Sequence, residues 1–169
     1  MKRVLFITNL VFVMISCVTY KPKDIRKIIE NDDICYVNNI NSLCCDLLER
    51  YAEKPDKLEF QKCEVCDSSQ VVVRAEYVTS GQDSFEVEKF LRKKYGMGKL
   101  RWICCGWESP GNYGSFRHKE ITKINPNFIV SITMYGNGEV FDEDGDFVEL
   151  EMDRSKVKQF VVLVEIVDC

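Results

Sequence analysis

Histidine is nearly absent from this chain of 169 residues, which contains a single one, His118. A lone imidazole excludes metal sites that need two histidines, and it leaves little room for a Ser–His–Asp triad. An excess of basic residues is also lacking, because 23 lysines and arginines face 27 aspartates and glutamates. Without a basic stripe to neutralise phosphates, no nucleic-acid partner is expected.

Long hydrophobic runs, internal repeats and low-complexity linkers are missing as well. The uncharged, mostly apolar stretch at residues 4–16 has only 13 residues, whereas a helix needs about 20 apolar residues to span a bilayer. The absence of repeats and linkers gives no reason to divide the chain further. We therefore expect a single domain over residues 28–169, preceded by an N-terminal leader.

The leader has the pattern of an export signal. Two basic residues precede the uncharged stretch, whose length is typical of the apolar region of a signal peptide. The sequence Val13-Met14-Ile15-Ser16, directly before Cys17, resembles the lipobox of bacterial lipoproteins, in which the cysteine is acylated and becomes the new N-terminus. We predict a signal peptide over residues 1–16 and lipid on Cys17, followed by a tether over residues 17–27. Cleaved secretion without lipid and an uncleaved anchor or buried helix are the alternatives.

Lipid on Cys17 predicts where the protein resides. Each buried methylene contributes about 0.8 kcal/mol, so several acyl chains on one cysteine hold a soluble domain at a membrane. We therefore expect a lipoprotein anchored in the bacterial cell envelope. Val18, rather than aspartate, follows Cys17, which favours the outer membrane where the host has one. Without lipid, the expected location is secreted or periplasmic.

Export determines how the remaining cysteines are interpreted. In an oxidising compartment an even set is most simply a disulfide framework, although sequence alone does not give its pairing. Neighbouring residues point in different directions, so each adjacent pair of cysteines is expected to bond two different partners. One expected crosslink joins the first helix to the strand that carries Cys104 and Cys105, and another engages Cys63 or Cys66. The disulfide candidates are Cys35, Cys44, Cys45, Cys63, Cys66, Cys104, Cys105 and Cys169.

Helix and strand patterns alternate along the domain. Apolar spacing predicts a short helical piece at residues 24–30 and a helix from Ser42, as its N-cap, through Ala52. The clearest helix begins with a capping box formed by Asp83 and Glu86 and ends at Gly96. Alternating or apolar runs predict five strands, at residues 57–63, 70–79, 99–107, 128–135 and 157–167.

The order of these elements predicts the fold class. Strands joined by hairpin-compatible links favour an antiparallel sheet. The last strand is apolar on both faces, which is typical of a central or well-covered position. We therefore expect a two-layer α+β domain with about five strands, two main helices packed on one face of the sheet, and disulfide crosslinks.

Several blocks between about Cys45 and Tyr135 resemble a known family. They include Cys45-Asp46-Leu47-Leu48 and Tyr95-Gly96-Met97, and above all Cys104-Cys105-Gly106-Trp107-Glu108. The family comprises small exported bacterial domains catalogued as a domain of unknown function. The resemblance implies an envelope location and a single α+β unit. It lends no catalytic residue, because none is assigned to the family.

Cys63-Glu64-Val65-Cys66 has the CxxC spacing of thiol–disulfide oxidoreductases. In those enzymes the motif begins a helix, whose dipole lowers the pKa of the nucleophilic thiol. Here the motif lies between two strand patterns, so a structural crosslink is favoured. An exported oxidoreductase using Cys63 and Cys66 is the alternative function, and zinc bound by thiolates is a third, weaker interpretation.

Asp142, Asp144 and Asp146 are weak calcium candidates, because hard oxygen ligands recur at alternate positions. The pattern departs from a calcium-binding hand loop, in which glycine stands at the sixth place, because Phe147 occupies that place. A solvated acidic turn is favoured, and no metal or other cofactor is expected.

The segment from Trp107 to His118 predicts a loop that offers aromatic side chains. Trp107, Tyr113 and Phe116 are the candidates for a binding surface, since aromatics supply large contact area at low entropic cost. The alternative is that Trp107 and Phe116 fold back over a sheet edge. His118 could serve Cys105 as a base, but a disulfide would remove that thiol, so no catalytic residue is predicted.

These patterns predict a non-catalytic binding module held at the cell envelope. Its partner is expected to be a protein or an envelope component, and the membrane itself is reached through the lipid on Cys17. An inhibitor-like or immunity-like role, in which a toxin or an enzyme is neutralised, fits this combination.

Overall fold

The computed structural model describes residues 17–18, 40–66, 70–111 and 113–169, the first two by their backbone alone. The signal peptide predicted at 1–16, most of the tether, the helical piece at 24–30 and Cys35 lie outside the described residues. None of the helices in the described part is long and apolar enough to cross a membrane.

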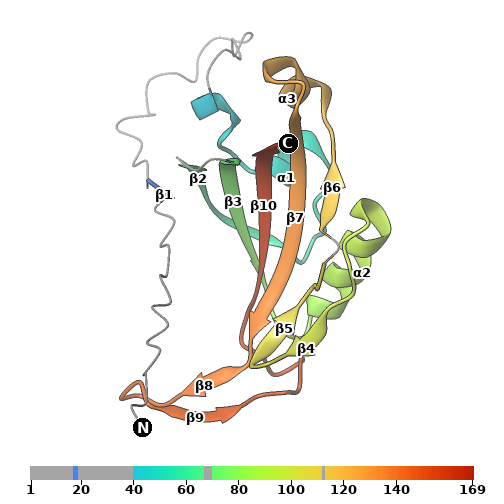
Figure 1. Cartoon of the computed structure of the whole chain (residues 1–169). Coiled ribbons are helices and arrows are strands. Elements are labelled where there is room, and N and C mark those ends of the chain that lie inside the picture. The colour runs from blue at the N-terminus through green and yellow to red at the C-terminus, as the bar shows by residue number, and fades with distance from the viewer. Residues whose placement is uncertain (1–16, 19–39, 67–69, 112) are drawn as a thin grey trace, which may run out of the picture.

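Most described strands form one antiparallel sheet, in which β10 lies between β3 and β7 (Figure 1). The strand order is β1-β2-β3-β10-β7-β5-β4, and β6 also pairs with β7. The strands are β1 (Cys17–Val18), β2 (Glu59–Cys66), β3 (Val71–Thr79), β4 (Arg101–Ile103), β5 (Gly106–Glu108), β6 (Gly114–Phe116), β7 (Phe128–Asn137) and β10 (Phe160–Asp168).

Three long strands at the centre follow the period of two that their sequences predict. On β10, Val162, Val164 and Ile166 are fully buried, while the residues between them are partly exposed. Val164 is paired with Ala75 on β3 and with Ile132 on β7, and both partners are buried too. The central position expected for the last strand is thereby confirmed, as are the α+β class and the antiparallel sheet.

The expected count of about five strands is wrong. The expected strand at 99–107 consists of two short strands, β4 and β5, because the chain reverses at Cys104 and Cys105. A further two-stranded ribbon, formed by β8 (Glu139–Phe141) and β9 (Phe147–Leu150), is separate from the main sheet. The expected arrangement in two layers stays a prediction.

Helix α2 (Ser84–Tyr95) is the longest described helix and occupies the predicted place. Gly96 ends it in the left-handed region, with φ of 75°, which glycine adopts without steric cost. The predicted capping box is wrong, because the Asp83 side chain caps no backbone N–H of the helix. Its carboxylate instead accepts a hydrogen bond of 2.7 Å from the Ser80 hydroxyl.

Helix α1 (Leu47–Tyr51) is shorter than predicted, and the predicted N-cap is wrong. Ser42 lies in a preceding 3-10 turn, η1 (Ile40–Leu43), and Asp46 caps α1 by accepting a hydrogen bond from the Glu49 N–H at 3.0 Å. Asp46 also accepts a hydrogen bond of 2.8 Å from the hydroxyl of the buried Tyr77. That bond ties the start of α1 to β3.

The hydrogen bonds that Asp46 accepts favour the ionised form of its carboxyl. Partial burial raises the pKa of its carboxyl, but the hydrogen bonds from Lys54, from the Glu49 N–H and from Tyr77 together outweigh burial and lower it. The Tyr77 oxygen in turn accepts a hydrogen bond from the Leu48 N–H at 3.0 Å. The carboxylate, the phenol and the helix start therefore form one connected network.

Helix α3 (Lys119–Ile124) follows the segment that was predicted as a loop. His118 is its N-cap, with Nδ1 accepting a hydrogen bond of 3.3 Å from the Glu120 N–H. The three α-helices of the described residues all contribute to the same apolar core as the sheet. Its helical members are Leu47, Leu48 and Tyr51 from α1, Val87, Leu91 and Tyr95 from α2, and Ile121 from α3.

Candidate functional site

The three aromatic binding candidates do not form one surface. Trp107 lies on β5 and is half-buried, with its ring 5.9 Å from that of Trp102 in an edge-to-face arrangement. The Arg154 guanidinium lies 5.7 Å from the centre of the Trp107 ring. Trp107 therefore belongs to the packing between β5 and Arg154, which corrects its assignment to a binding loop.

Phe116 also packs inward. It lies on β6, and its ring is 5.4 Å from that of Tyr95 at the end of α2. The neighbouring His118 ring lies 5.2 Å from the Tyr51 ring and uses Nδ1 to cap α3. Phe116 and His118 therefore pack the helices α1, α2 and α3 against the sheet. The ring of Phe116 is engaged in this packing and is not presented to a partner.

Tyr113 is the one candidate that is well exposed, at 63% of its surface. It lines a groove of about 490 Å³ together with side chains on the less buried face of β3, β7 and β10. The groove contains the Arg74–Glu165 ion pair, with 2.6 Å between nitrogen and oxygen, and apolar side chains such as Leu163 and Val167. Arg74 and Glu165 neutralise each other, so this ion pair gives no preference for one class of ligand.

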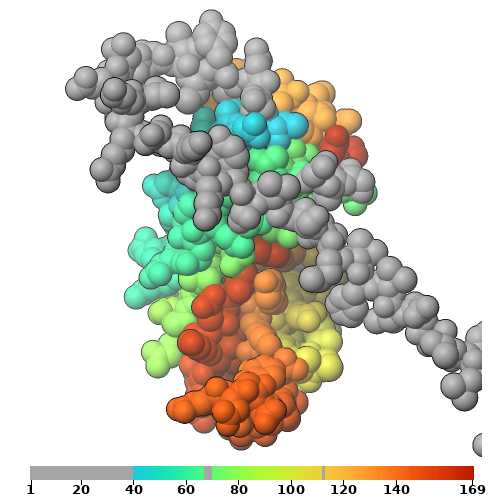
Figure 2. All heavy atoms as spheres, turned by 90° about the vertical axis from the view of Figure 1, so that its left-hand side faces the viewer, coloured from blue at the N-terminus to red at the C-terminus, as the bar shows by residue number. Residues whose placement is uncertain are grey.

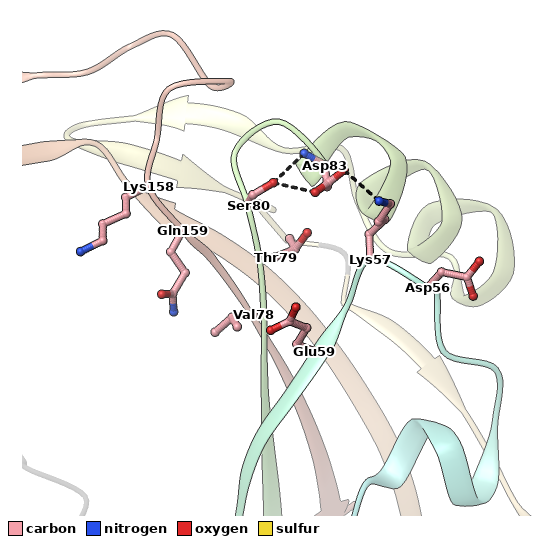
Figure 3. A pocket seen from close by; sticks show the side chains of 9 residues that line it. All are labelled: Asp56, Lys57, Glu59, Val78, Thr79, Ser80, Asp83, Lys158 and Gln159. Atoms are coloured by element: carbon pink, nitrogen blue, oxygen red, sulfur yellow. Dashed lines mark hydrogen bonds and ion pairs between the residues drawn. The ribbon is translucent and has the colours of Figure 1, made fainter.

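A second hollow, of about 460 Å³, lies where β3 leads into α2 (Figure 3). Lys57 faces Asp83 across it at 4.0 Å, and Glu59 and Lys158 line it further out. The buried Thr79 hydroxyl has no hydrogen-bond partner among the described residues. Charges of both signs at exposed positions again point to no particular ligand.

The described cysteines form one disulfide, between Cys44 and Cys63, whose Cα atoms are 5.5 Å apart. The crosslink connects the segment before α1 to β2. The expected crosslink from the first helix to the strand with Cys104 and Cys105 is therefore wrong. Four other candidates form no disulfide with another described residue, namely Cys45, Cys104, Cys105 and Cys169.

The CxxC spacing of Cys63 and Cys66 does not create a redox pair. Both residues lie on β2, where residues three apart point to opposite faces of the sheet. Cys63 is bonded to Cys44, and Cys66 is buried at the end of the strand. No helix begins at this motif to lower a thiol pKa, so the geometry gives the oxidoreductase alternative no support.

Burial and charge affect the Cys45 thiol next to this crosslink. Burial is the largest influence and raises the pKa of Cys45, despite the nearby Arg50 guanidinium. The thiol donates a hydrogen bond of 3.4 Å to the Leu43 carbonyl. A half-buried thiol with a raised pKa is a poor nucleophile at neutral pH.

A two-stranded arm is the most unusual surface feature, and the sequence reasoning missed it. The β8–β9 arm, which we define as residues 138–152, extends from the end of the main sheet (Figure 1), and it forms the orange end of the molecule in Figure 2. Half of the large hydrophobic side chains that are exposed in the described part of the chain lie on it. They are Val140, Phe141, Phe147, Val148, Leu150 and Met152.

Side-chain contacts hold the two strands of the arm together and fix its base to the main sheet. Phe141 and Phe147 are 52% and 57% exposed, yet their rings contact each other edge to face, with 6.3 Å between centres. At the base, a Cβ on Gly138 would lie 2.4 Å from the Trp102 ring, so only glycine fits there. The paired aromatics on either side of the acidic turn were the sequence signal for this hairpin.

The acidic turn at the tip of the arm satisfies its own backbone. Asp142 Oδ1 accepts hydrogen bonds from the N–H groups of Asp144 and Asp146, at 3.0 and 2.8 Å. The turn also contains Gly145 with φ of 87°. No group of three or more side chains suited to a metal ion occurs among the described residues, these calcium candidates included. The Asp142 carboxylate therefore stabilises the turn, and the acidic side chains around it supply negative charge.

Comparison with known proteins adds one finding. Residues 34–107 match the family model of a domain of unknown function, DUF4952. The matched region contains α1, α2 and β2 to β4, and it ends at Trp107, before β7, the arm and β10. The expected similarity to a domain of unknown function is confirmed, whereas a family-wide Cys104–Glu108 block and bacterial export stay predictions. No curated protein and no solved structure matches the chain.

Proposed function

We propose that this chain is a lipid-anchored, non-catalytic binding module of the bacterial cell envelope, and that its β8–β9 arm captures a protein partner. The observation that carries the proposal is the exposure of six large apolar side chains on one two-stranded ribbon. Several large apolar side chains exposed on one small element of a soluble domain are typical of an interaction site. A ribbon of two strands is also only marginally stable alone in water, so a partner that covers it would stabilise it.

The charge of the arm indicates the chemistry of its partner. The arm contains seven of the 27 acidic residues of the chain and none of the 23 basic residues. These carboxylates flank the apolar side chains, as in Leu150 between Glu149 and Glu151. We therefore propose a protein partner with an apolar groove bordered by basic residues. Such a partner is attracted by the charges and held by Phe141 and Phe147.

The site of contact can be tested by photocrosslinking in cells that produce the full chain. A photoreactive phenylalanine analogue replaces Phe147, and the matched control carries it at Lys123, an exposed position on α3. We expect one dominant protein adduct from position 147 and none from position 123. The yield should fall several-fold when the ionic strength is raised before irradiation, because salt screens the attraction between the acidic arm and a basic groove.

Two results would contradict this assignment. Absence of an adduct from position 147 would show that the arm contacts no partner. Equal adducts from positions 147 and 123 would show that capture is unspecific. The variant Glu149→Gln/Glu151→Gln adds a second test, since its adduct yield should also fall although its apolar surface is unchanged.

The anchor is tested separately through Cys17. We expect the wild-type chain in the membrane fraction, with an N-terminal peptide that begins at Cys17 and carries acyl groups in mass spectrometry. The variant Cys17→Ser should be released into the soluble fraction, because serine lacks the thiol to which the lipid is attached, and the acyl chains that hold the domain at the membrane are then missing. A wild-type chain that retains Met1 and is found in the cytosol would overturn the envelope location.

A further inference from the structure

The turn between β4 and β5 consists of two adjacent cysteines. Ile103 is paired with Gly106, so Cys104 and Cys105 alone form the loop of the hairpin. Cys104 has φ of 56° and is the only non-glycine residue of the described part with a positive φ. Its side chain is exposed, and that of Cys105 is half-exposed. The two thiols are therefore held together on a tight turn that solvent reaches.

Cys66 and Cys169 lie far from this hairpin, and Cys44 and Cys63 are bonded to each other. Gly106 is paired with Asn137 at one end of β7, whereas Asp168, next to Cys169, is paired with Phe128 at the other end. At about 3.3 Å per residue the two ends of β7 are roughly 30 Å apart. Cys66, one residue beyond the Val65–Val73 pair, lies toward the same far end. Cys63 is already bonded to Cys44.

The two side chains of the turn contact each other. A hydrogen bond between the Cys104 and Cys105 thiols, with the nearby Glu139 carboxylate adding to its effect, raises the pKa of the Cys105 thiol. Cys104 is the more exposed of the two and the more accessible to a dissolved reagent. Their adjacency also makes a second reaction step intramolecular, which accelerates it strongly.

We infer that Cys104 and Cys105 form a reversible redox site, which a low-molecular-weight disulfide oxidises to a vicinal disulfide. The Cys104 thiolate attacks one sulfur of the reagent RS–SR, forming a mixed disulfide and releasing one thiolate, RS⁻. The Cys105 thiolate then attacks the Cys104 sulfur, forms the Cys104–Cys105 bond and releases the second RS⁻. The protein loses two electrons and two protons, and the reagent takes up both as two molecules of RSH.

The closed form is expected to be easy to reduce. Adjacent Cα atoms are only about 3.8 Å apart across a trans peptide bond, below the roughly 4.4–6.8 Å that disulfides usually span. Strained and exposed disulfides are the labile ones, in contrast to structural crosslinks. The pair therefore differs in role from Cys44–Cys63, whose Cα separation of 5.5 Å lies within the usual range.

The turn is connected to the base of the β8–β9 arm. The Cys105 carbonyl accepts a hydrogen bond of 2.9 Å from the N–H of Gly138, and the Gly138 carbonyl accepts one of 2.7 Å from the N–H of Glu151. Ring closure strains the peptide bond between Cys104 and Cys105, and the Cys105 carbonyl lies on the next peptide bond, directly outside the ring. We therefore expect closure to turn this carbonyl and to weaken the first of these bonds. The importance of this link for partner capture rests on the proposed function of the arm, whereas the redox chemistry does not.

The experiment titrates the purified protein with glutathione disulfide and reduced glutathione, blocks free thiols with N-ethylmaleimide in denaturant, and digests with trypsin. Cleavage after Arg101 and Arg117 yields one peptide, 102–117, that holds both cysteines and no others. We expect this peptide to change from a form with two maleimides to a closed form that carries none and is two hydrogens lighter than the unlabelled peptide. Adding reduced glutathione before the labelling should restore the form with two maleimides. The closed form should also show several-fold faster amide exchange at Gly138.

Variants separate the possible outcomes. Cys104→Ser and Cys105→Ser should each stop at a stable mixed disulfide with glutathione, whereas the matched control Cys169→Ser should still close the ring. A peptide that keeps two maleimides at every ratio, or that is linked to another peptide, would overturn the inference. Unchanged exchange at Gly138 in the closed form would overturn the link to the arm. None of these readouts depends on partner capture, so failure of the proposed function is distinguishable.

Discussion

Replacing Glu88 by alanine is expected to lower the free energy of unfolding by about 3–5 kcal/mol. The Glu88 side chain lies on α2 and forms an ion pair with Arg154, and each residue is only 4% exposed. Removing the carboxylate leaves the guanidinium buried without a counter-charge. It also leaves the Leu100 N–H without its acceptor, since that group donates to Glu88 at 3.0 Å.

The surroundings of Arg154 explain why the guanidinium cannot simply move into water. Its nitrogens donate to the hydroxyl and the carbonyl of Ser84, at 2.8 and 2.7 Å. Its central carbon, Cζ, also lies 4.2 Å from the centre of the Phe85 ring and 5.2 Å from that of Phe160. The side chain is thus enclosed by α2 and β10, and the lost carboxylate is not replaced by solvent.

The prediction is checked by urea denaturation of the wild type and of matched variants. Glu53→Ala breaks an exposed ion pair with Lys94 and should cost less than about 1 kcal/mol. The double variant Glu88→Leu/Arg154→Met should recover much of the lost stability, because apolar side chains replace both charges. If Glu88→Ala costs no more than Glu53→Ala, the ion pair does not hold this region together.

The position of Arg154 gives the ion pair a role beyond stability. Arg154 lies two residues after Met152, the last residue of the arm, so the bond to Glu88 fixes the returning end of the arm to α2. At the other end, Gly138 fits closely under Trp102. An arm that is fixed at both ends holds Phe141 and Phe147 in one orientation. For the partner binding that we propose, this would lower the conformational entropy that the arm loses on association.

The long elements could be predicted from the sequence because their side chains repeat with one period over many residues. Strand β3, strand β10 and helix α2 each have such a pattern, and tertiary contacts reinforce it. The short elements have no such repeat. Strands β4 and β5 have three residues each, and the turn between them uses cysteines instead of the glycine or asparagine that usually mark a hairpin. The pattern therefore predicted one continuous strand.

The candidate site was harder to predict, because exposure is a property of the whole fold. Trp107 and Phe116 are of residue types that are common in binding loops. In the structure, however, Trp107 packs against Arg154 and Phe116 packs against Tyr95, and both of these partners are distant in sequence. The sequence around Ser42 is typical of a helix N-cap, but Asp46 caps α1 instead. The hydrogen bond that Asp46 accepts from Tyr77 joins elements that are distant in sequence, so local sequence does not reveal it. Conversely, the alternation of Val148 and Leu150 with glutamates predicts an ordinary half-buried strand, and only the structure shows that no core covers it.

Removing the disulfide is the second large effect that we expect. The variant Cys44→Ala/Cys63→Ala should lose about 3 kcal/mol of unfolding free energy. The two cysteines are separated by 19 residues, and opening a loop of that size raises the conformational entropy of the unfolded chain. The crosslink also fastens the segment before α1 to β2, beside the network of Asp46 and Tyr77. Its loss should therefore weaken the packing of α1 first.

The measurement compares urea unfolding of the wild type and the variant with and without a strong reductant. The wild type should lose its extra stability on reduction, whereas the variant should be insensitive. The variant Cys104→Ser/Cys105→Ser should respond to reductant as the wild type does, because the stabilising bond lies elsewhere. Equal stability of the oxidised and reduced wild type would show that the Cys44–Cys63 bond does not stabilise the domain. The expected loss instead means that the chain reaches full stability only in an oxidising compartment, as its leader predicts.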